Sequence, residues 1–506
     1  MQMPRASGIL MHIASLPGSS GIGTLGKAAY DFVDFLKDAS QTYWQILPVC
    51  PTSYGDSPYQ SFSTFAGNPY FIDLDLLHQD GFLQEEEYRD IDWGRTDTHI
   101  DYGLLYVRRH QLFQKIQKRF AENPPADYKW FCEKHAFWLE DYALFMAIKD
   151  AHDGVAFSKW EDDIRTRKPG VMDMWRVKCS ERVQYYKMLQ YFFFKQWFAL
   201  KRYANNKGIR IIGDLPIYVA ADSADVWANP RQFCLDGDGN PIEVAGCPPD
   251  AFSEDGQLWG NPVYNWPYMR RTRYRWWVDR LRMSLKTYDV IRIDHFRGFD
   301  SYYCIPYGAV NAKKGVWRTG PGVHLWNTVR RKLGDIPVIA EDLGLMTDSV
   351  RQMVKDSGFP GMKVLQFAFD AQGESDYLPH RYAHNSVVYT GTHDNDTIRG
   401  WMEQTAEEDL NFAIAYLRAA DINDLPDQMM LAGLASVADT CILTMQDLIG
   451  LGSEARMNTP STVGENWCWR ATADQMTPAM AERLSYYTKL YGRIHTKTTI
   501  PEEDDE

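Results

Sequence analysis

The chain lacks the features that mark several large classes of protein. Its eight cysteines are scattered, with no Cys-x-x-Cys pair, so we expect neither a disulfide framework nor a cysteine-based zinc site. It has no block rich in lysine and arginine, and its formal net charge is −13, which argues against a nucleic-acid or anionic-membrane surface. It has no apolar run of membrane-spanning length, and residues 1–8 do not form the apolar core of a signal peptide. These absences predict a cytoplasmic protein without nucleic-acid or membrane partners.

What the chain does contain is a large supply of apolar and aromatic residues. Hydrophobic residues make up 45% of its 506 positions, which is enough to bury a large core. Aromatic residues make up 14%, including 17 tryptophans and 29 tyrosines. Aromatic rings stack on the flat C–H faces of sugars, so the composition fits a glycan cleft. A large core explains the same composition equally well.

Eight short apolar runs end in polar or glycine-containing turns and predict strands at residues 8–12, 43–49, 208–214, 290–294, 338–341, 362–369, 386–392 and 440–447. Strands separated by helical patterns pair in parallel, and eight of them can close into a (β/α)8 TIM barrel. We therefore treat residues 1–506 as a single catalytic barrel.

Two intervals between the predicted strands are too long for simple crossovers. Residues 50–207 contain amphipathic runs and are expected to form a mostly helical insertion. Residues 215–289 are rich in proline, glycine, asparagine and tryptophan, and are expected to form an irregular insertion that covers the active site. Both insertions should lie at the C-terminal face, where barrel enzymes hold their active sites.

The most informative strand is the one that ends at Asp294. Alternation along a strand points Arg292 and Asp294 to the same side. A guanidinium beside a carboxylate favours the ionised form, which is the form that acts as a nucleophile. Taken alone, this pair could also be a structural ion pair at a strand end.

Two later strands also end in acids. One ends in Glu341, and another ends in His393 and Asp394. Acids at the same end of parallel strands converge at one mouth of a barrel. A nucleophilic carboxylate, a protonatable glutamate and a third acid are the groups that a retaining glycosidic-bond enzyme requires.

Several segments carry a specific resemblance. The sequences RIDHFRG, AEDLG, YTGTHDNDT and GDLPIYVA, with further matches, resemble signature segments of the amylomaltases, the 4-α-glucanotransferases of the α-amylase superfamily; they lie at residues 292–298, 340–344, 389–397 and 213–220. The resemblance implies one barrel with large inserted subdomains and no C-terminal β-sandwich. It also implies that no cofactor is needed.

The resemblance also suggests roles for individual residues. It implies three catalytic carboxyl groups: Asp294 as nucleophile, Glu341 as general acid/base, and Asp394, which with His393 would hold sugar hydroxyls. It further implies a substrate-binding set made of Tyr59, Asp214, Asp250, Phe252, Gln257, Trp259, Arg292, His393, Asn458 and Asn466.

Two segments invite a metal-binding interpretation. Residues 393–396 (HDND) could supply metal ligands, but no second cluster with ligand spacing accompanies them. Residues 236–240 (DGDGN) resemble the start of a calcium loop, but Pro241 and Cys247 stand where that loop needs glycine and glutamate. We therefore expect no metal site, and a hairpin turn at residues 236–240.

The expected reaction moves a segment of an α-1,4-glucan to the 4-hydroxyl of another glucan or of glucose. It would pass through a covalent glycosyl-enzyme, with retention of configuration. The expected partners are maltooligosaccharides and linear α-glucans, and nothing in the sequence indicates a protein partner. Two alternatives stay open: a retaining α-1,4-glucan hydrolase of the same superfamily, and a non-catalytic glycan-binding protein.

Overall fold

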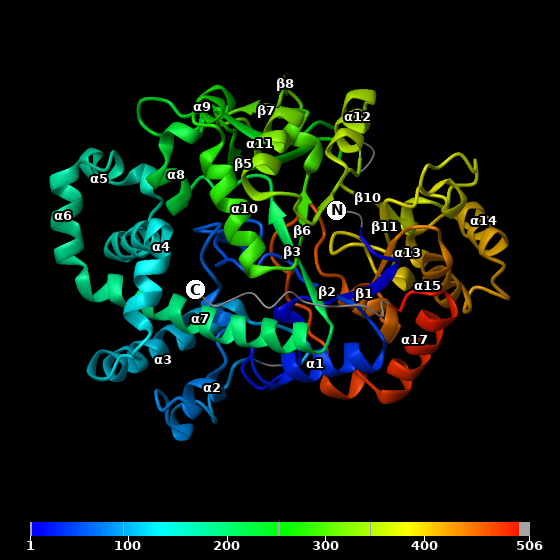
Figure 1. Ribbon diagram of the computed structural model, residues 1–506, viewed down its shortest axis with the longest axis horizontal. Coiled ribbons are helices and arrows are strands. Elements are labelled where there is room, and N and C mark those ends of the chain that lie inside the picture. The colour runs from blue at the N-terminus through cyan, green and yellow to red at the C-terminus, as the bar shows by residue number, and fades with distance from the viewer. Residues whose placement is uncertain (1–2, 95, 250–252, 345, 495–506) are drawn as a thin grey trace.

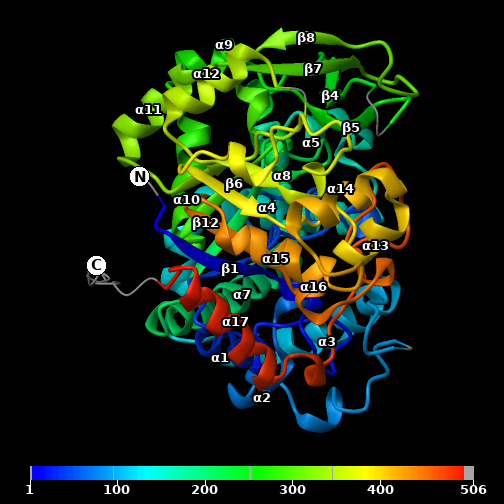
Figure 2. The ribbon, with the colours of Figure 1, turned by 90° about the vertical axis from the view of Figure 1, so that its right-hand side faces the viewer.

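The computed structural model describes residues 3–94, 96–249, 253–344 and 346–494. Its centre is a closed parallel barrel with the strand order β1-β12-β11-β10-β9-β6-β3-β2 (Figures 1 and 2). The strands are β1 (Ala6–Leu10), β2 (Tyr43–Gln45), β3 (Arg210–Pro216), β6 (Val290–Asp294), β9 (Val338–Ala340), β10 (Gly361–Val364), β11 (Ser386–Tyr389) and β12 (Thr440–Thr444).

All eight predicted strands are therefore confirmed as barrel strands, and the fold is the predicted (β/α)8 barrel. Six of them end earlier than predicted, and in two cases a helix follows at once. A 3-10 helix (Leu365–Phe367) follows β10, and helix α16 (Met445–Ile449) follows β12. At β12 the side chain of Thr444 accepts a hydrogen bond from the Asp447 backbone N–H, which caps α16 and ends the strand.

The register of three adjacent strands places the polar residues of interest. Arg292 on β6 pairs with Asp214 on β3, and Ile293 pairs with Ala340 on β9. Asp294 and Glu341 are the next residues after that last pair. Because the strands are parallel, their C-terminal ends lie at one mouth of the barrel.

An outer layer of helices packs around the barrel (Figures 1 and 2). Helix α12 shows how the sequence sets their limits. The Thr347 side chain accepts a hydrogen bond from the Val350 N–H at its start, and Gly358 takes a left-handed conformation (φ 75°) at its end. The main helices of this layer are α1 (Lys27–Asp38), α10 (Arg275–Thr287), α11 (Val323–Leu333), α12 (Asp348–Ser357), α15 (Leu425–Ala435) and α17 (Pro478–Leu490).

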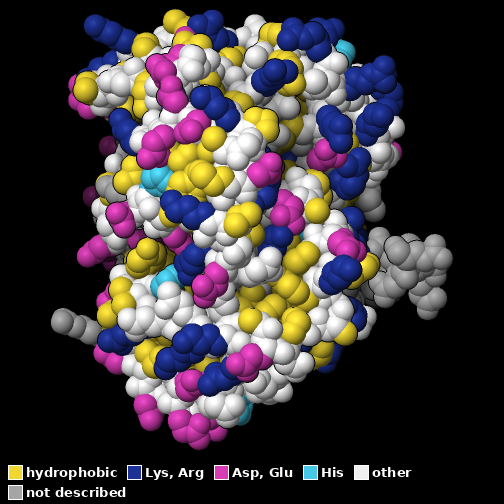
Figure 3. Space-filling view, turned by 90° about the vertical axis from the view of Figure 1, so that its left-hand side faces the viewer, with side chains coloured by type: hydrophobic (Ala, Val, Ile, Leu, Met, Phe, Trp, Pro, Cys, Tyr) yellow, Lys and Arg dark blue, Asp and Glu magenta, His cyan; other side chains and the backbone are white. Residues whose placement is uncertain are grey.

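The segment between β2 and β3 is built mainly from helices and lies to the left in Figure 1. Its outward face carries charged side chains interspersed with apolar patches (Figure 3). Helix α4 packs along α7, and α7 leads directly into β3. These helices are α2 (Leu74–Gln79), α3 (Tyr102–Glu122), α4 (Tyr128–Ala151), α5 (Asp162–Arg165), α6 (Pro169–Lys178) and α7 (Ser180–Asn206).

The segment 215–289 is more regular than its composition indicates. It contains α8 (Ala224–Ala228), α9 (Trp266–Arg271) and α10, and the strands β4 (Glu243–Cys247) and β5 (Gln257–Pro262). These two strands join β7 (Ser301–Pro306) and β8 (Val316–Thr319) in an antiparallel sheet of order β5-β4-β7-β8. The sheet was not predicted, because its strands are short and β7 lies beyond a barrel strand.

The turn predicted at residues 236–240 is confirmed. Leu235 and Pro241 form an antiparallel bridge across it. The Asp236 carboxylate accepts hydrogen bonds from the backbone N–H groups of Asp238 and Asn240, both at 2.9 Å. Within the described ranges, no helix combines the length and the apolarity needed to cross a membrane.

Candidate active site

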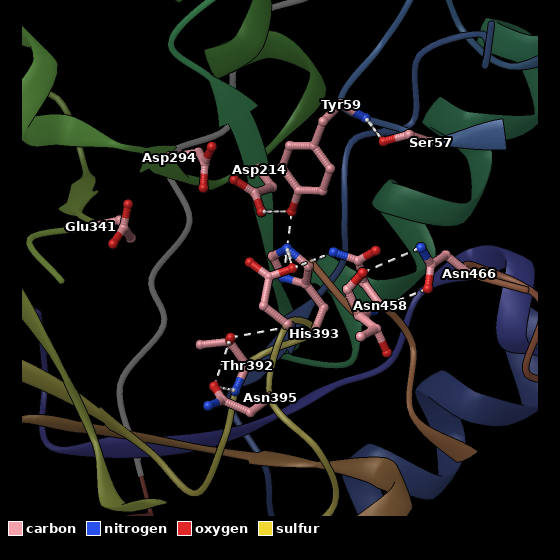
Figure 4. Close-up of polar contacts among 12 residues, drawn as sticks. Ser57, Tyr59, Asp214, Asp294, Glu341, Thr392, His393, Asn395, Asn458 and Asn466 are labelled. Atoms are coloured by element: carbon pink, nitrogen blue, oxygen red, sulfur yellow. Dashed lines mark hydrogen bonds and ion pairs between the residues drawn. The ribbon is translucent and has the colours of Figure 1, made fainter. Parts of the chain in front are cut away.

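The polar ends of the barrel strands meet around one cleft (Figure 4). Asp294 is the last residue of β6, Glu341 directly follows β9, and Asp214 lies within β3. His393 and Asp394 belong to the loop that follows β11. Four separate elements of the barrel thus supply these five side chains, as expected for a site at the C-terminal face.

Arg292 joins two of the carboxylates. One of its terminal nitrogens, Nη1, donates to Asp214 Oδ2 at 2.6 Å, and the other, Nη2, donates to Asp294 Oδ1 at 3.1 Å. The side chains of Arg292 and Asp214 are 3% and 0% exposed, whereas that of Asp294 is 29% exposed. The guanidinium therefore fixes the Asp294 carboxylate through its Oδ1 atom, while part of the carboxylate stays exposed to the cleft.

Tyr59 connects Asp214 to His393. Its hydroxyl donates to Asp214 Oδ2 at 2.7 Å, and its ring stacks on the His393 imidazole with 5.0 Å between centroids. Burial, reinforced by the Asp214 charge, raises the pKa of Tyr59 well above its ordinary value. The phenol therefore stays protonated and serves as a hydrogen-bond donor.

Glu341 is held by the backbone of its neighbours. Its Oε2 accepts from the His295 N–H at 2.6 Å, and its Oε1 accepts from the Leu343 N–H at 3.0 Å. Burial raises the pKa of Glu341, while Arg292 and the two N–H groups oppose that shift. A partly buried glutamate that keeps its proton at higher pH is suited to act as a general acid.

Asp294 and Glu341 interact as a pair. Burial raises the pKa of Asp294 well above its ordinary range, the Arg292 guanidinium opposes the shift, and the charge of Glu341 adds to it. Two neighbouring, partly buried carboxyl groups favour a state in which they hold one proton between them. The direct ion pair with Arg292 favours Asp294 as the ionised partner.

Asp394 is oriented by two neighbours. Its Oδ1 accepts from Asn458 Nδ2 at 2.6 Å and lies 3.4 Å from His393 Nε2. The Asp394 side chain is 45% exposed, so it can reach a ligand in the cleft. His393 is buried, and burial lowers its pKa, so its imidazole is neutral and can exchange hydrogen bonds with hydroxyl groups.

Comparison with known proteins identifies the family. A family model described as 4-alpha-glucanotransferase matches residues 11–476. The chain belongs to the 4-alpha-glucanotransferase family. It is 48% identical over 485 residues to a 4-alpha-glucanotransferase of Clostridium butyricum, covering 96% of this chain and 100% of the relative. It is 49% identical over 494 residues to one of Streptococcus pneumoniae, covering 97% and 98%.

A solved structure agrees with this assignment. The amylomaltase of Streptococcus agalactiae in complex with acarbose superposes with a TM-score of 0.95 at 44% identity, covering 97% of this chain and 99% of that chain. The resemblance to the amylomaltases noted in the sequence is therefore confirmed, and the protein is a glycosyl-transferring enzyme of this family.

The remaining predicted glucanotransferase residues have different surroundings. On β5, the Trp259 ring nitrogen donates to Gln257 Oε1 at 3.0 Å, and the Trp259 ring packs edge-on against His295 at 4.8 Å. The Asn466 side chain hydrogen-bonds to Thr459 and Thr462, so its contacts shape its own loop. Asp250 and Phe252 lie outside the described residues. The substrate-binding roles of these residues stay predictions.

The glucanotransferase site also contains side chains that the sequence did not single out. Arg456 donates to the Asp394 carbonyl at 2.7 Å and to the Asn458 carbonyl at 2.9 Å. The Trp467 ring packs against Tyr59 at 5.7 Å and His393 at 5.8 Å. Arg456 lies two residues before Asn458 and Trp467 directly follows Asn466, but no local pattern in the sequence marked either residue.

The segment His393–Asp396 is engaged by protein groups. The Asp396 side chain accepts hydrogen bonds from the Thr397 backbone N–H, Gln404 and Ser453, with distances of 2.8 Å. Over the described stretches, no group of three or more His, Cys, Asp or Glu side chains is arranged to hold a metal ion. The bonds of Asp396 instead join the loop after β11 to the loop that carries Arg456.

Proposed function

We propose that this glucanotransferase moves a segment of an α-1,4-glucan to the 4-hydroxyl of another glucan or of glucose, with Asp294 as nucleophile and Glu341 as general acid/base. The observation that carries these assignments is the β6–β9 register: Ile293 pairs with Ala340, and the two carboxyl groups follow on adjacent strands. Asp294 accepts a hydrogen bond from the Arg292 guanidinium, whereas Glu341 is held by backbone N–H groups.

The reaction has two steps. In the first, an Asp294 carboxylate oxygen bonds to the anomeric carbon while the glycosidic C–O bond breaks, and Glu341 gives its proton to the departing oxygen. In the second, the Glu341 carboxylate takes the proton of the acceptor 4-hydroxyl. The acceptor oxygen then bonds to the anomeric carbon and Asp294 is released. Two displacements at one carbon retain its configuration.

The other polar groups hold the transferred sugar. We assign Asp394 and His393 to its hydroxyl groups, because the Asp394 carboxylate is exposed to the cleft and both side chains are fixed by neighbours. Tyr59 can present its ring to the sugar while Asp214 holds its hydroxyl. Arg292 orients Asp294 and offsets negative charge in the cleft.

The proposed donors and acceptors are maltooligosaccharides and linear α-glucans. We also propose a cytoplasmic location, supported by the wide spacing of the eight cysteines along the chain, which is typical of reduced thiols. A retaining hydrolase would share the first step and use water in the second. Incubation with maltotriose separates the two: transfer gives glucose and longer oligosaccharides, whereas hydrolysis gives glucose and maltose without longer products.

Two substitutions test the residue roles. Asp294→Asn should lower kcat by several orders of magnitude while the protein stays folded. Glu341→Gln should block maltotriose yet partly spare a donor with a good leaving group, which needs little acid help. Asp335→Asn is the control, because the Asp335 side chain is 68% exposed and pairs with Arg330 on the outer helix α11 at 3.0 Å. Near-normal activity in both test variants would refute the assignment.

A further inference from the structure

His295 has an unusual backbone conformation. It lies between Asp294, the proposed nucleophile, and the 3-10 helix Phe296–Phe299. Its φ and ψ are 51° and 46°, in the left-handed region that residues with a Cβ rarely adopt. Such conformations persist only where surrounding contacts enforce them, and they are concentrated at functional sites.

Three main-chain hydrogen bonds around this turn involve Glu341. The His295 N–H donates to Glu341 Oε2 at 2.6 Å, and the next residue, Phe296, donates its N–H to the Glu341 carbonyl at 3.0 Å. The Glu341 N–H in turn donates to the carbonyl of Ile293 at 3.1 Å. The left-handed turn thus connects the two proposed chemical residues through the main chain.

The imidazole of His295 packs against the antiparallel sheet that contains β5, and this contact supports the turn. It meets the Trp259 ring edge-to-face at 4.8 Å and 86°. The Trp259 carbonyl accepts from Gln60 Nε2 at 3.2 Å, which ties β5 to the loop carrying Tyr59. On the other side Gly298 allows close approach, because a Cβ there would lie 3.2 Å from His295 Cδ2.

We propose that His295 is a positioning residue for Glu341: its left-handed backbone, braced by Trp259, directs an N–H at the acid/base carboxyl group and sets when that group holds its proton. This inference rests on the proposed role of Glu341. A hydrogen bond to a carboxylate favours the ionised form, so this N–H opposes the rise in pKa that burial causes. The imidazole itself is neutral, because burial, with Arg297 nearby, lowers its pKa to about 3.

A pair of variants separates the backbone from the imidazole. His295→Gly and His295→Ala both remove the ring, but only glycine adopts φ near +51° freely. We expect the alkaline limb of the kcat/KM profile to shift upward by about half a pH unit or more in the alanine variant, because the N–H is withdrawn from Glu341, and to shift less in the glycine variant. The alanine defect should also be smaller on a donor with a good leaving group.

Two measurements keep the test decisive. If His295→Ala does not fold, Trp259→Ala should move the same limb, because it removes the ring that braces the turn and leaves His295 itself in place. Equal losses in the glycine and alanine variants with an unmoved limb would overturn the proposal and indicate that the imidazole is needed directly. The alkaline limb of Glu341→Gln tests the acid/base role separately: a limb that persists there would refute the proposed function, whatever His295 does.

Discussion

Arg292 and Asp214 form a buried ion pair across strands β6 and β3, with 2.6 Å between Nη1 and Oδ2. The same guanidinium contacts Asp294 through its other nitrogen. A planar fork of N–H donors can serve two carboxylates at once, which a single ammonium group cannot do with the same geometry.

Arg292→Lys should therefore lower kcat strongly, by about a hundredfold or more. The charge would remain, but the Asp294 carboxylate would lose its fixed orientation. Steady-state transfer rates on maltotriose measure the effect. The control is Arg318→Lys, since Arg318 donates two hydrogen bonds to Glu243 at 2.7 and 2.6 Å. Both residues belong to the antiparallel sheet β5-β4-β7-β8. Equal losses in the two variants would contradict a site-specific role.

Asp294→Asn should stabilise the fold at neutral pH. Burial raises the pKa of Asp294 in the folded state above its unfolded value, so the folded protein binds this proton more tightly. The contribution of such a group to stability is present below the unfolded pKa and is lost as pH rises through the folded pKa. Asparagine has no such proton to lose.

Unfolding temperatures from about pH 4 to about pH 8 measure this effect. The variant should unfold at nearly the wild-type temperature in acid and roughly 1–2 °C above it near neutrality, a change of about 1 kcal/mol. Asp335→Asn is the control, since that side chain is 68% exposed. A gain that is constant with pH would argue against the titration of Asp294 as its cause.

Trp259→Ala should raise the ratio of hydrolysis to transfer, even if total turnover falls. Transfer competes with water only if the site excludes water and positions the acceptor hydroxyl. Free reducing ends, compared with chain-length redistribution, give the ratio. Leu258→Ala is the matched control, because Leu258 is the adjacent residue on β5 and is 40% exposed. An unchanged ratio with a lowered unfolding temperature would mean that the ring only stabilises the sheet.

Arg493→Ala should destabilise the whole fold by about 3 kcal/mol. Arg493 is fully buried and donates to backbone carbonyls at the end of α15 and at the start of β1, including those of Leu434 at 2.6 Å and Ala6 at 2.9 Å. Its loss leaves these buried acceptors unpaired. Urea unfolding measures the change, with Arg483→Ala as control, since Arg483 and its partner Asp427 are about half exposed. A similar small cost in both variants would contradict this role.

The sequence by itself determined the eight barrel strands and the acids at their ends. Runs such as the one at residues 290–294 alternate and are β-branched, and these properties are local, so they can be read without knowing what each strand contacts. The parallel arrangement then required Asp294, Glu341 and Asp394 to share one mouth of the barrel.

Only the tertiary structure decided the contacts between distant segments. In the antiparallel sheet β4 pairs with β7, although the barrel strand β6 lies between them in the sequence. Such short strands cannot be recognised from sequence until the strands that they pair with are known. Trp467 reaches Tyr59 from the far end of the chain, and no local pattern specifies such a contact. The left-handed backbone of His295 is likewise set by Glu341 and Trp259, because its own sequence does not favour that conformation.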